Sequence, residues 1–262
     1  MTLVTAATTT PLGQRLDLFG VDVTVSTYEH ATDAVIEAAL AHRSFGLSAL
    51  AVHGLMEAVA DPTFRDQVNS LSMAVPDGQP VRWALNLLHH ADLDDRVYGP
   101  ELTWRVIEAA AATGIGIYLF GSTEATCNAF VDAIHDRHPD AKVLDVQPDR
   151  FRDATPEEDL ADIERINASG AGIVLVGRGC PRQERWVADH QGKVNAAMLA
   201  VGAAFDYGAG TLEPPPSWMQ RLGLQWLFRL GQEPGRLWKR YLITNSKFLW
   251  HLARAMVSRP SA

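Results

Sequence analysis

The residue best suited by type and spacing to acid–base chemistry is Asp77, which directly follows an apolar segment in Val-Pro-Asp-Gly-Gln. A carboxylate in such a position can act as a general base that takes a proton from a hydroxyl group. Residue type and spacing by themselves favour an aspartate that caps a turn or a helix. The sequence therefore nominates Asp77 as a catalytic base and leaves a structural role open.

Further polar residues stand in glycine-rich segments later in the chain. Gln183 and Glu184 end the segment Gly-Arg-Gly-Cys-Pro-Arg-Gln-Glu, and Asp206 lies in Ala-Ala-Phe-Asp-Tyr-Gly. These side chains could orient a ligand, or they could belong to an ordinary first helical turn. Together with Asp77 they suggest a site at the ends of three strands, but they do not identify a reaction.

Glycines precede the helices expected after residues 120 and 176. Gly121 opens Gly-Ser-Thr-Glu, and Gly177 and Gly179 flank an arginine. Free backbone N–H groups at a helix N-terminus favour a phosphate, although every α/β protein has such turns. Neither segment is GxGxxG or GxxxxGK[ST], so a nicotinamide-dependent oxidoreductase or a P-loop NTPase loses support.

Two features that could hold a metal lack the necessary spacing. His89 and His90 precede an Asp-x-Asp, but adjacent histidines at a helix end point apart. The two cysteines, Cys127 and Cys180, have no metal-ligand spacing, and their small number favours a reducing cytoplasm. We expect no metal site and no cofactor.

The elements that must position these residues alternate between short apolar strands and amphipathic helices, within a chain of 262 residues of which 47% are hydrophobic. This alternation predicts an α/β fold with a mostly parallel sheet, whose carboxyl edge binds ligands. The expected strands are 46–52, 72–75, 116–120, 142–146, 172–176 and 196–201. The expected helices are 54–69, 81–88, 101–112, 123–137, 156–168 and 181–189.

Charge is distributed unevenly along the chain. Residues 217–262 carry a formal charge of +7 and four of the seven tryptophans, whereas the preceding residues carry −15. A basic terminus on an acidic body points to an anionic partner. Nucleic acid is disfavoured because the body is acidic and no known reader motif occurs.

The segment 237–256 has the pattern of a basic amphipathic helix. Arg240, Lys247 and Arg254 recur every seven residues among apolar positions. Such a helix could lie on an anionic membrane surface, dock on a partner, or bind a diphosphate within the same molecule through its arginines. A merely solvated basic face also fits the pattern.

The chain divides into three parts on this reading. Residues 1–15 form a flexible lead-in without the character of a signal peptide, 16–216 an α/β catalytic domain, and 217–262 a basic, Trp-rich helical appendage. No apolar run approaches the ~18 residues that suggest a spanning helix.

Several motifs together resemble the WecG/TagA/CpsF family of bacterial glycosyltransferases, in the family's order and over most of residues 20–245. They include Pro-Asp-Gly at 76–78, Arg-Val-Tyr-Gly-Pro-Glu-Leu at 96–102 and the glycine-rich segments at 119–122 and 176–184. Val-Gly-Ala-Ala-Phe-Asp at 201–206, Gly-Leu-Gln-Trp-Leu-Phe-Arg-Leu at 223–230 and Glu-Pro-Gly-Arg-Leu-Trp-Lys-Arg-Tyr at 233–241 complete the resemblance.

This resemblance implies a metal-independent, inverting transferase with a Rossmann-like core. The family moves an N-acetylmannosamine-type or related sugar from a UDP donor to a polyprenyl-diphosphate-linked saccharide, at the cytoplasmic face of the plasma membrane. It also implies peripheral contact with an anionic membrane surface and a homo-oligomer.

Residue by residue, the resemblance makes Asp77 the base that deprotonates the acceptor hydroxyl. Donor-binding positions are Gly121, Gly177, Gly179, Gln183, Glu184 and Asp206. Basic positions that bind diphosphate or the acceptor are Arg96, Arg229, Arg236 and Arg240. Cationic groups there would neutralise the departing UDP in place of a metal.

The chain departs from the family pattern at a few positions. Ala49 and Ala51 stand where the family has Thr-x-Asn, Pro214 where it has an arginine, and Gln225 where it has an acid; His53 could supply a polar group instead. A changed donor or acceptor follows from these losses. A non-catalytic binding protein for nucleotide-sugars or polyprenyl phosphates is the alternative, and an oxidoreductase on a similar fold is a third hypothesis.

Overall fold

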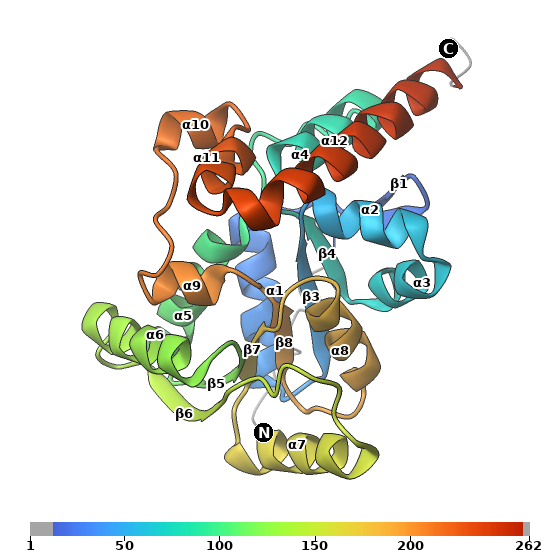
Figure 1. The fold of residues 1–262 in the computed structure, drawn as a ribbon. Coiled ribbons are helices and arrows are strands. Elements are labelled where there is room, and N and C mark those ends of the chain that lie inside the picture. Colours follow the sequence, from blue (N-terminus) through green and yellow to red (C-terminus); the bar gives the residue numbers. More distant parts are fainter. Residues whose placement is uncertain (1–12, 259–262) are drawn as a thin grey trace, which may run out of the picture.

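The fold is built on a six-stranded sheet in which all strands run parallel, in the order β4-β3-β8-β7-β5-β6. The computed structural model describes residues 13–258 (Figure 1). The strands are β3 (Phe45–Leu50), β4 (Met73–Pro76), β5 (Gly116–Gly121), β6 (Lys142–Gln147), β7 (Ile173–Gly177) and β8 (Ala197–Ala200). Each of the six expected strands is present, and the predicted α/β fold class is confirmed.

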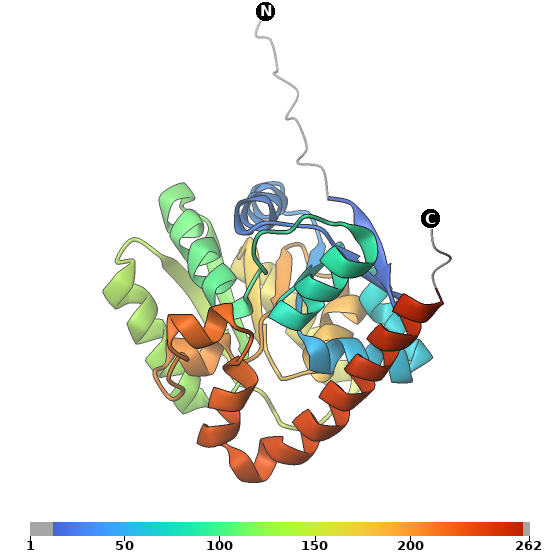
Figure 2. The same cartoon turned by 90° about the horizontal axis from the view of Figure 1, so that it is seen from above.

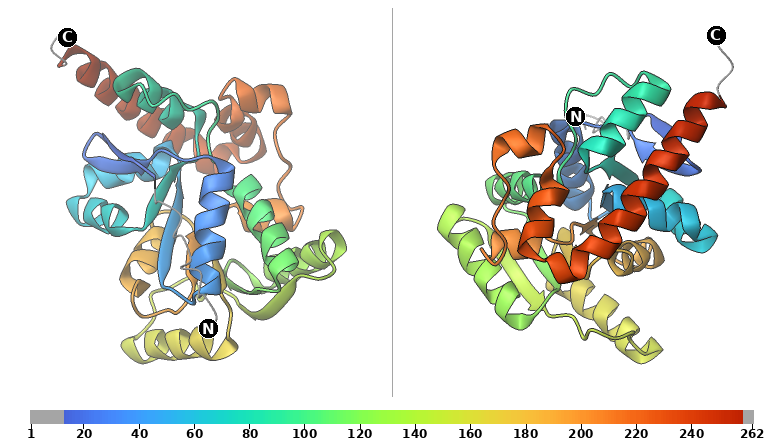
Figure 3. Two further views of the ribbon diagram at one scale, coloured as in Figure 1. Left: turned by 180° about the vertical axis from the view of Figure 1, so that it is seen from behind. Right: turned by 45° about the horizontal axis from the view of Figure 1, so that its top comes forward.

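Both faces of this sheet are covered, because its central strands are apolar at every position. Ile173 and Leu175 of β7 pack on one side, and Val174 and Val176 pack on the other. The first side is covered by α1 (Tyr28–Leu40), α5 (Gly99–Thr113), α6 (Glu124–Arg137) and α9 (Ala204–Gly208), of which α1 stands in front in the view from behind (Figure 3). The opposite side is covered by α7 (Pro156–Ser169) and α8 (Arg182–His190).

The helix expected over 54–69 is in fact two helices, α2 (Val52–Ala60) and α3 (Pro62–Ser70). Pro62 has no N–H group with which to continue α2. The Asp61 carboxylate accepts hydrogen bonds from the N–H groups of Thr63 and Phe64 and so caps α3. The prediction of one helix was therefore wrong at the Asp-Pro pair, which is itself a helix-start signal.

Sequence analysis assigned no element to residues 16–40, where the structure has an antiparallel hairpin, β1 (Arg15–Leu18) and β2 (Val21–Thr24), followed by α1. The hairpin packs in a cluster with α2, α3 and α4 (Gln79–His89). The expected lead-in at 1–15 lies outside the described residues up to residue 12, and Arg15 is already part of β1.

The C-terminal segment forms three helices, α10 (Ser217–Arg221), α11 (Gln225–Gln232) and α12 (Pro234–Val257). Seen from above, α12 crosses the molecule beside α2 (Figure 2). Leu237 and Phe248 are buried on the inner side of α12, and the Phe248 ring meets that of Phe19 edge-on at 5.9 Å. Among the described residues, no helix is long and apolar enough to cross a membrane.

The short helix α9, which carries Asp206, is held in place by close packing against α6. A Cβ atom on Gly208 would lie 2.2 Å from two atoms of the Phe130 ring, which is fully buried. Only glycine therefore fits at this contact.

We expect Gly208→Ala to lower the free energy of unfolding by about 1–3 kcal/mol, because the extra methyl group overpacks the core. Gly231→Ala is the matched control, since a Cβ atom at Gly231 of α11 meets no atom within 4 Å. Alanine should stabilise that helix by roughly 0.5–1 kcal/mol. Denaturant unfolding of both variants measures the difference, and similar values for the two would contradict this packing argument.

Candidate active site

A cavity of ≈ 530 Å³ lies over the carboxyl ends of the parallel strands, with residues of α11 and α12 forming its far wall. This is the edge at which open α/β sheets bind ligands. It brings together nine of the residues named from the sequence: Asp77, Arg96, Gly177, Gly179, Gln183, Glu184, Asp206, Arg229 and Arg240. Segments more than 150 residues apart in the chain thus meet in one cavity.

Asp77 lies immediately after β4 and faces this cavity. Its N–H group donates to the Leu50 carbonyl at 3.2 Å, which extends the pairing of β4 with β3 by one residue. Its Oδ1 atom accepts a hydrogen bond of 2.9 Å from the N–H group of Gly99, the first residue of α5. Burial raises the pKa of Asp77, and the nearby Arg96 guanidinium and the Gly99 N–H group offset part of that rise.

Arg96 is only 4% exposed and stacks on the Tyr98 ring at 4.4 Å. Its guanidinium contacts the Gln225 Oε1 atom and donates to Gln220 Oε1 at 3.3 Å. Both partners are neutral amides, so they position the guanidinium without cancelling its charge. A glutamate in place of Gln225 would instead form an ion pair that weakens the attraction for an anion.

Two more arginines reach the cavity from the C-terminal helices. Arg229 of α11 pairs with Glu233 at 3.5 Å, and its buried Nε atom has no hydrogen-bond partner within residues 13–258. Arg240 of α12 lines the same cavity. Arg236 lies on α12, but its side chain is outside what the structure describes.

Gln183 and Glu184 are buried at the start of α8. The Gln183 amide accepts from the Gly179 N–H group at 3.1 Å and donates to Glu184 Oε1 at 2.9 Å. Burial raises the pKa of Glu184, although the hydrogen bond from Gln183 favours its charged form. These bonds hold the glycine-rich segment against α8.

The glycines named from the sequence divide into two groups. Gly177 and Gly179 line the cavity, and a Cβ atom on Gly179 would meet nothing within 4 Å. Gly121 is not among the residues that line it. A Cβ atom on Gly121 would lie 2.6 Å from the backbone of Gly177, so this glycine lets β5 and β7 approach each other at their ends.

Three of the positions at which the chain departs from the family pattern have distinct places. Ala49 and Ala51 line the cavity beside His53, whose pKa is lowered by burial and by Arg240. Pro214 is exposed and does not line it. The cavity wall near Asp77 is therefore less polar than the family motif implies, and His53 is neutral there at pH 7.

Sequence reasoning missed several residues of this cavity. Tyr98, Tyr207 and Tyr241 line it, and burial raises the pKa of Tyr98 and Tyr241, so both stay uncharged. Arg178 and Asp149 also line it. Arg178 stands within the glycine-rich segment quoted above, but nothing local in the sequence pairs it with an aspartate 29 residues away.

The histidine and aspartate segment at 89–95 does not line the cavity. Within the described part of the chain, no three His, Cys, Asp or Glu side chains gather where they could hold a metal ion.

Comparison with known proteins agrees with this geometry. Residues 16–262 match the model of the glycosyl transferase WecG/TagA/CpsF family. Over 186 residues the chain is 27% identical to the N-acetylglucosaminyldiphosphoundecaprenol N-acetyl-beta-D-mannosaminyltransferase of Bacillus subtilis (strain 168), which covers 71% of this chain and 70% of that protein. The family match extends over both the α/β body and the C-terminal helices that complete the cavity, and the chain is a glycosyltransferase that belongs to the WecG/TagA/CpsF family.

Proposed function

We propose that this glycosyltransferase moves an N-acetylmannosamine-type or related sugar from a UDP donor to a polyprenyl-diphosphate-linked saccharide, with inversion and without a metal. The observation that carries this proposal is the convergence of one carboxylate, Asp77, with Arg96, Arg229 and Arg240 in one cavity. The name of the Bacillus subtilis relative supports both the sugar and the lipid-linked acceptor.

In this reaction Asp77 takes the proton of the acceptor hydroxyl. The hydroxyl oxygen attacks the anomeric carbon from the face opposite the nucleotide, the bond from that carbon to the UDP oxygen breaks, and the configuration inverts. A raised pKa makes the Asp77 carboxylate a stronger base than a solvated aspartate, which suits proton transfer near neutral pH. The Gly99 N–H group fixes the direction of the carboxylate.

The arginines stabilise the negative charge that develops on the departing diphosphate. Charge-assisted hydrogen bonds from guanidinium groups to phosphate oxygens are strong and directional. The partners of Arg96 are neutral amides, which do not form an ion pair with it. The buried Nε–H group of Arg229 donates to no other group in the part of the chain that the structure describes. Cations held in place in this way stabilise the charge that develops in the transition state, and this stabilisation supplies much of the rate enhancement.

The outer face of α12 suits the surface on which a lipid-linked acceptor resides. Trp238, Leu242 and Leu249 are each more than half exposed and lie within about 40° of one another around the helix, and the exposed Lys239 lies beside them. A helix with apolar and basic residues on one exposed face binds anionic membrane surfaces. We propose that the protein acts at the inner, cytoplasmic face of the plasma membrane, and self-association stays a prediction.

The first prediction concerns Asp77→Asn, which preserves the volume and the acceptor for Gly99. Turnover should fall by about 10²–10⁴-fold because no base remains, whereas UDP binding should be largely unchanged. Release of UDP in the presence of a polyprenyl-diphosphate-linked acceptor, together with calorimetry, measures both quantities.

Asp66→Asn, at an exposed position of α3, serves as the control and should have full activity. Unchanged turnover of Asp77→Asn would reject the role of the base. A wild type that binds UDP-sugars but releases no UDP with any donor would favour the alternative, a binding protein without catalysis.

The raised pKa of Asp77 also predicts a cost in stability. Because the folded state holds this proton more tightly than the unfolded state, stability falls as the pH rises from the ordinary value of 3.8 through the raised one. Asp77→Asn should therefore melt at a higher temperature than the wild type at pH 7, with the difference vanishing below pH 3.8. Calorimetric melts over this pH range test the sign, and a lower melting temperature of Asp77→Asn at pH 7 would show that burial does not dominate.

Membrane binding is tested by the double variant Leu242→Ser, Leu249→Ser, which leaves the inner side of α12 intact. Full burial of a leucine side chain contributes about 1.5–3 kcal/mol, so even partial burial of these two in the lipid interface predicts a loss of affinity for anionic vesicles of about tenfold or more. Sedimentation with phosphatidylglycerol vesicles measures it. Leu160→Ser, an exposed leucine on α7, is the matched control, and equal binding by both variants would remove α12 from the contact.

A further inference from the structure

The cavity extends well beyond Asp77, to a second wall that the mechanism above does not use. Asp77 follows β4, whereas Ser122 follows β5, four strands away in the sheet order. With neighbouring strands about 4.8 Å apart, the two positions lie roughly 19 Å from each other along the edge. A donor that spans the cavity must therefore place one end near Asp77 and the other near this second wall.

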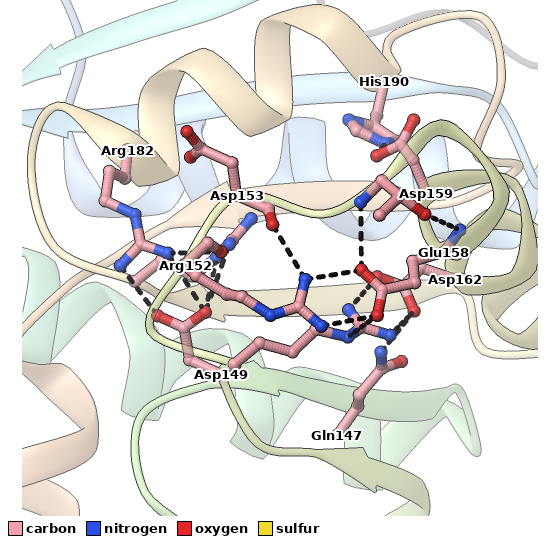
Figure 4. Close-up of polar contacts among 12 residues, drawn as sticks. Gln147, Asp149, Arg152, Asp153, Glu158, Asp159, Asp162, Arg182 and His190 are labelled. Atoms are coloured by element: carbon pink, nitrogen blue, oxygen red, sulfur yellow. Dashed lines mark hydrogen bonds and ion pairs between the residues drawn. The ribbon is translucent and has the colours of Figure 1, made fainter.

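The second wall is built around Asp149, whose side chain is only 2% exposed. Arg178 donates to Asp149 Oδ1 at 3.1–3.2 Å, and Arg182 donates to both carboxylate oxygens at 3.0 and 3.3 Å. The Asp149 N–H group donates to the Ser122 carbonyl at 2.9 Å, which ties the loop after β6 to the end of β5. Figure 4 shows Arg182 and Asp149 directed toward each other.

The loop after β6, which carries Asp149, is also anchored to α7. Arg150 makes two hydrogen bonds to Asp162 of α7, at 2.6 and 2.8 Å. Arg152 makes two to Glu158, at 2.7 and 2.6 Å, and Glu158 also belongs to the capping box at the start of α7 (Figure 4). These charge-assisted pairs hold the loop between them in one conformation.

Phe151 lies between these two anchored arginines in the chain, and most of its surface is exposed. The residue is 64% exposed, lines the cavity and has φ +54°, in the left-handed region that a phenylalanine rarely adopts. A rigidly presented, solvent-facing aromatic ring beside guanidinium groups is a stacking platform of the kind that binds bases.

We propose that Phe151, Asp149 and Arg182 bind the nucleoside end of the nucleotide donor, an assignment that rests on the proposed use of a UDP-sugar. The base stacks on Phe151. Asp149 accepts from the N–H group of a uracil edge, and Arg182 donates to the adjacent carbonyl oxygen. Gly177 and Gly179 line the cavity between the two ends, where the diphosphate crosses, so that the sugar lies toward Asp77.

The decisive variant is Phe151→Ala, because the side chain is exposed and its loss leaves the arginine anchors in place. Stacking on an aromatic side chain is worth about 1–3 kcal/mol per base, so UDP affinity should fall about 5–150-fold. Affinity for inorganic pyrophosphate should stay the same, and kcat at saturating donor should change far less than KM. Leu160→Ala, which removes another exposed apolar side chain, should affect none of these.

Calorimetry of the full-length protein with UDP and with pyrophosphate separates the outcomes. If the wild type binds UDP and Phe151→Ala binds it equally well, the nucleoside lies elsewhere and this proposal alone fails. An equal loss for UDP and pyrophosphate also overturns it, because the variant would then have damaged the phosphate region. A wild type that binds no uridine nucleotide at all would overturn the proposed function together with this assignment.

Asp149→Asn tests the hydrogen-bonding edge separately. The wild type should prefer UDP to CDP by about tenfold or more. Cytosine lacks the N3–H group that would donate to Asp149, and it has an amine at C4 where uracil has a carbonyl. The variant should narrow that preference. A preference that is absent from the wild type, or unchanged in a variant whose melting curve shows it folded, would remove Asp149 from base recognition.

Discussion

The candidate site depends on arginine side chains that are held in a partly desolvated cavity. Arg96, Arg229 and Arg240 face the cavity with Asp77 as the carboxylate of the reacting centre. Charges that leave water lose hydration, and this loss is recovered only when a partner of opposite sign arrives. Amides rather than carboxylates hold Arg96. In the proposed reaction, the diphosphate of the donor is the counter-charge that this end of the site receives.

The same principle distinguishes the two ends of the cavity. At the second wall, Arg178 and Arg182 share the carboxylate of Asp149, so both guanidinium groups already have an anionic hydrogen-bond partner. The end at Asp77, where neutral amides hold Arg96, suits the phosphates and the developing charge of the proposed reaction. The hydrogen-bonded second wall suits a neutral base whose polar edge must be matched group by group. One cavity thereby offers different chemistry along its length.

Much of the fold follows from local pattern, whereas the second wall does not. Most of the six strands are apolar runs that can be recognised in the sequence, and the edge strand β6, with Lys142, Asp145 and Gln147, is the exception. The hairpin of β1 and β2 is too short and too polar to stand out in the sequence, and its packing against α2, α3 and α4 stabilises it. Asp77 could be identified from the sequence because it directly follows a predicted strand. Asp149 could not, because its role depends on Arg178 and Arg182, which only the folded sheet brings beside it.

The C-terminal helices show why a sequence pattern can predict a helix correctly and still leave open what each part of its surface contacts. Arg240, Lys247 and Arg254 share a seven-residue spacing, yet Arg240 lines the cavity while Lys247 and Arg254 are exposed. In a straight helix, residues seven positions apart are rotated by about 20° around the axis. Because α12 also extends past the cavity along α2, each of the three basic residues faces different surroundings. The sequence left open whether the basic segment binds a membrane or a diphosphate. Under the proposed function one helix makes both contacts, because its N-terminal half reaches the end of the cavity where the donor's diphosphate departs, while its outer face stays open to the lipid surface that carries the acceptor.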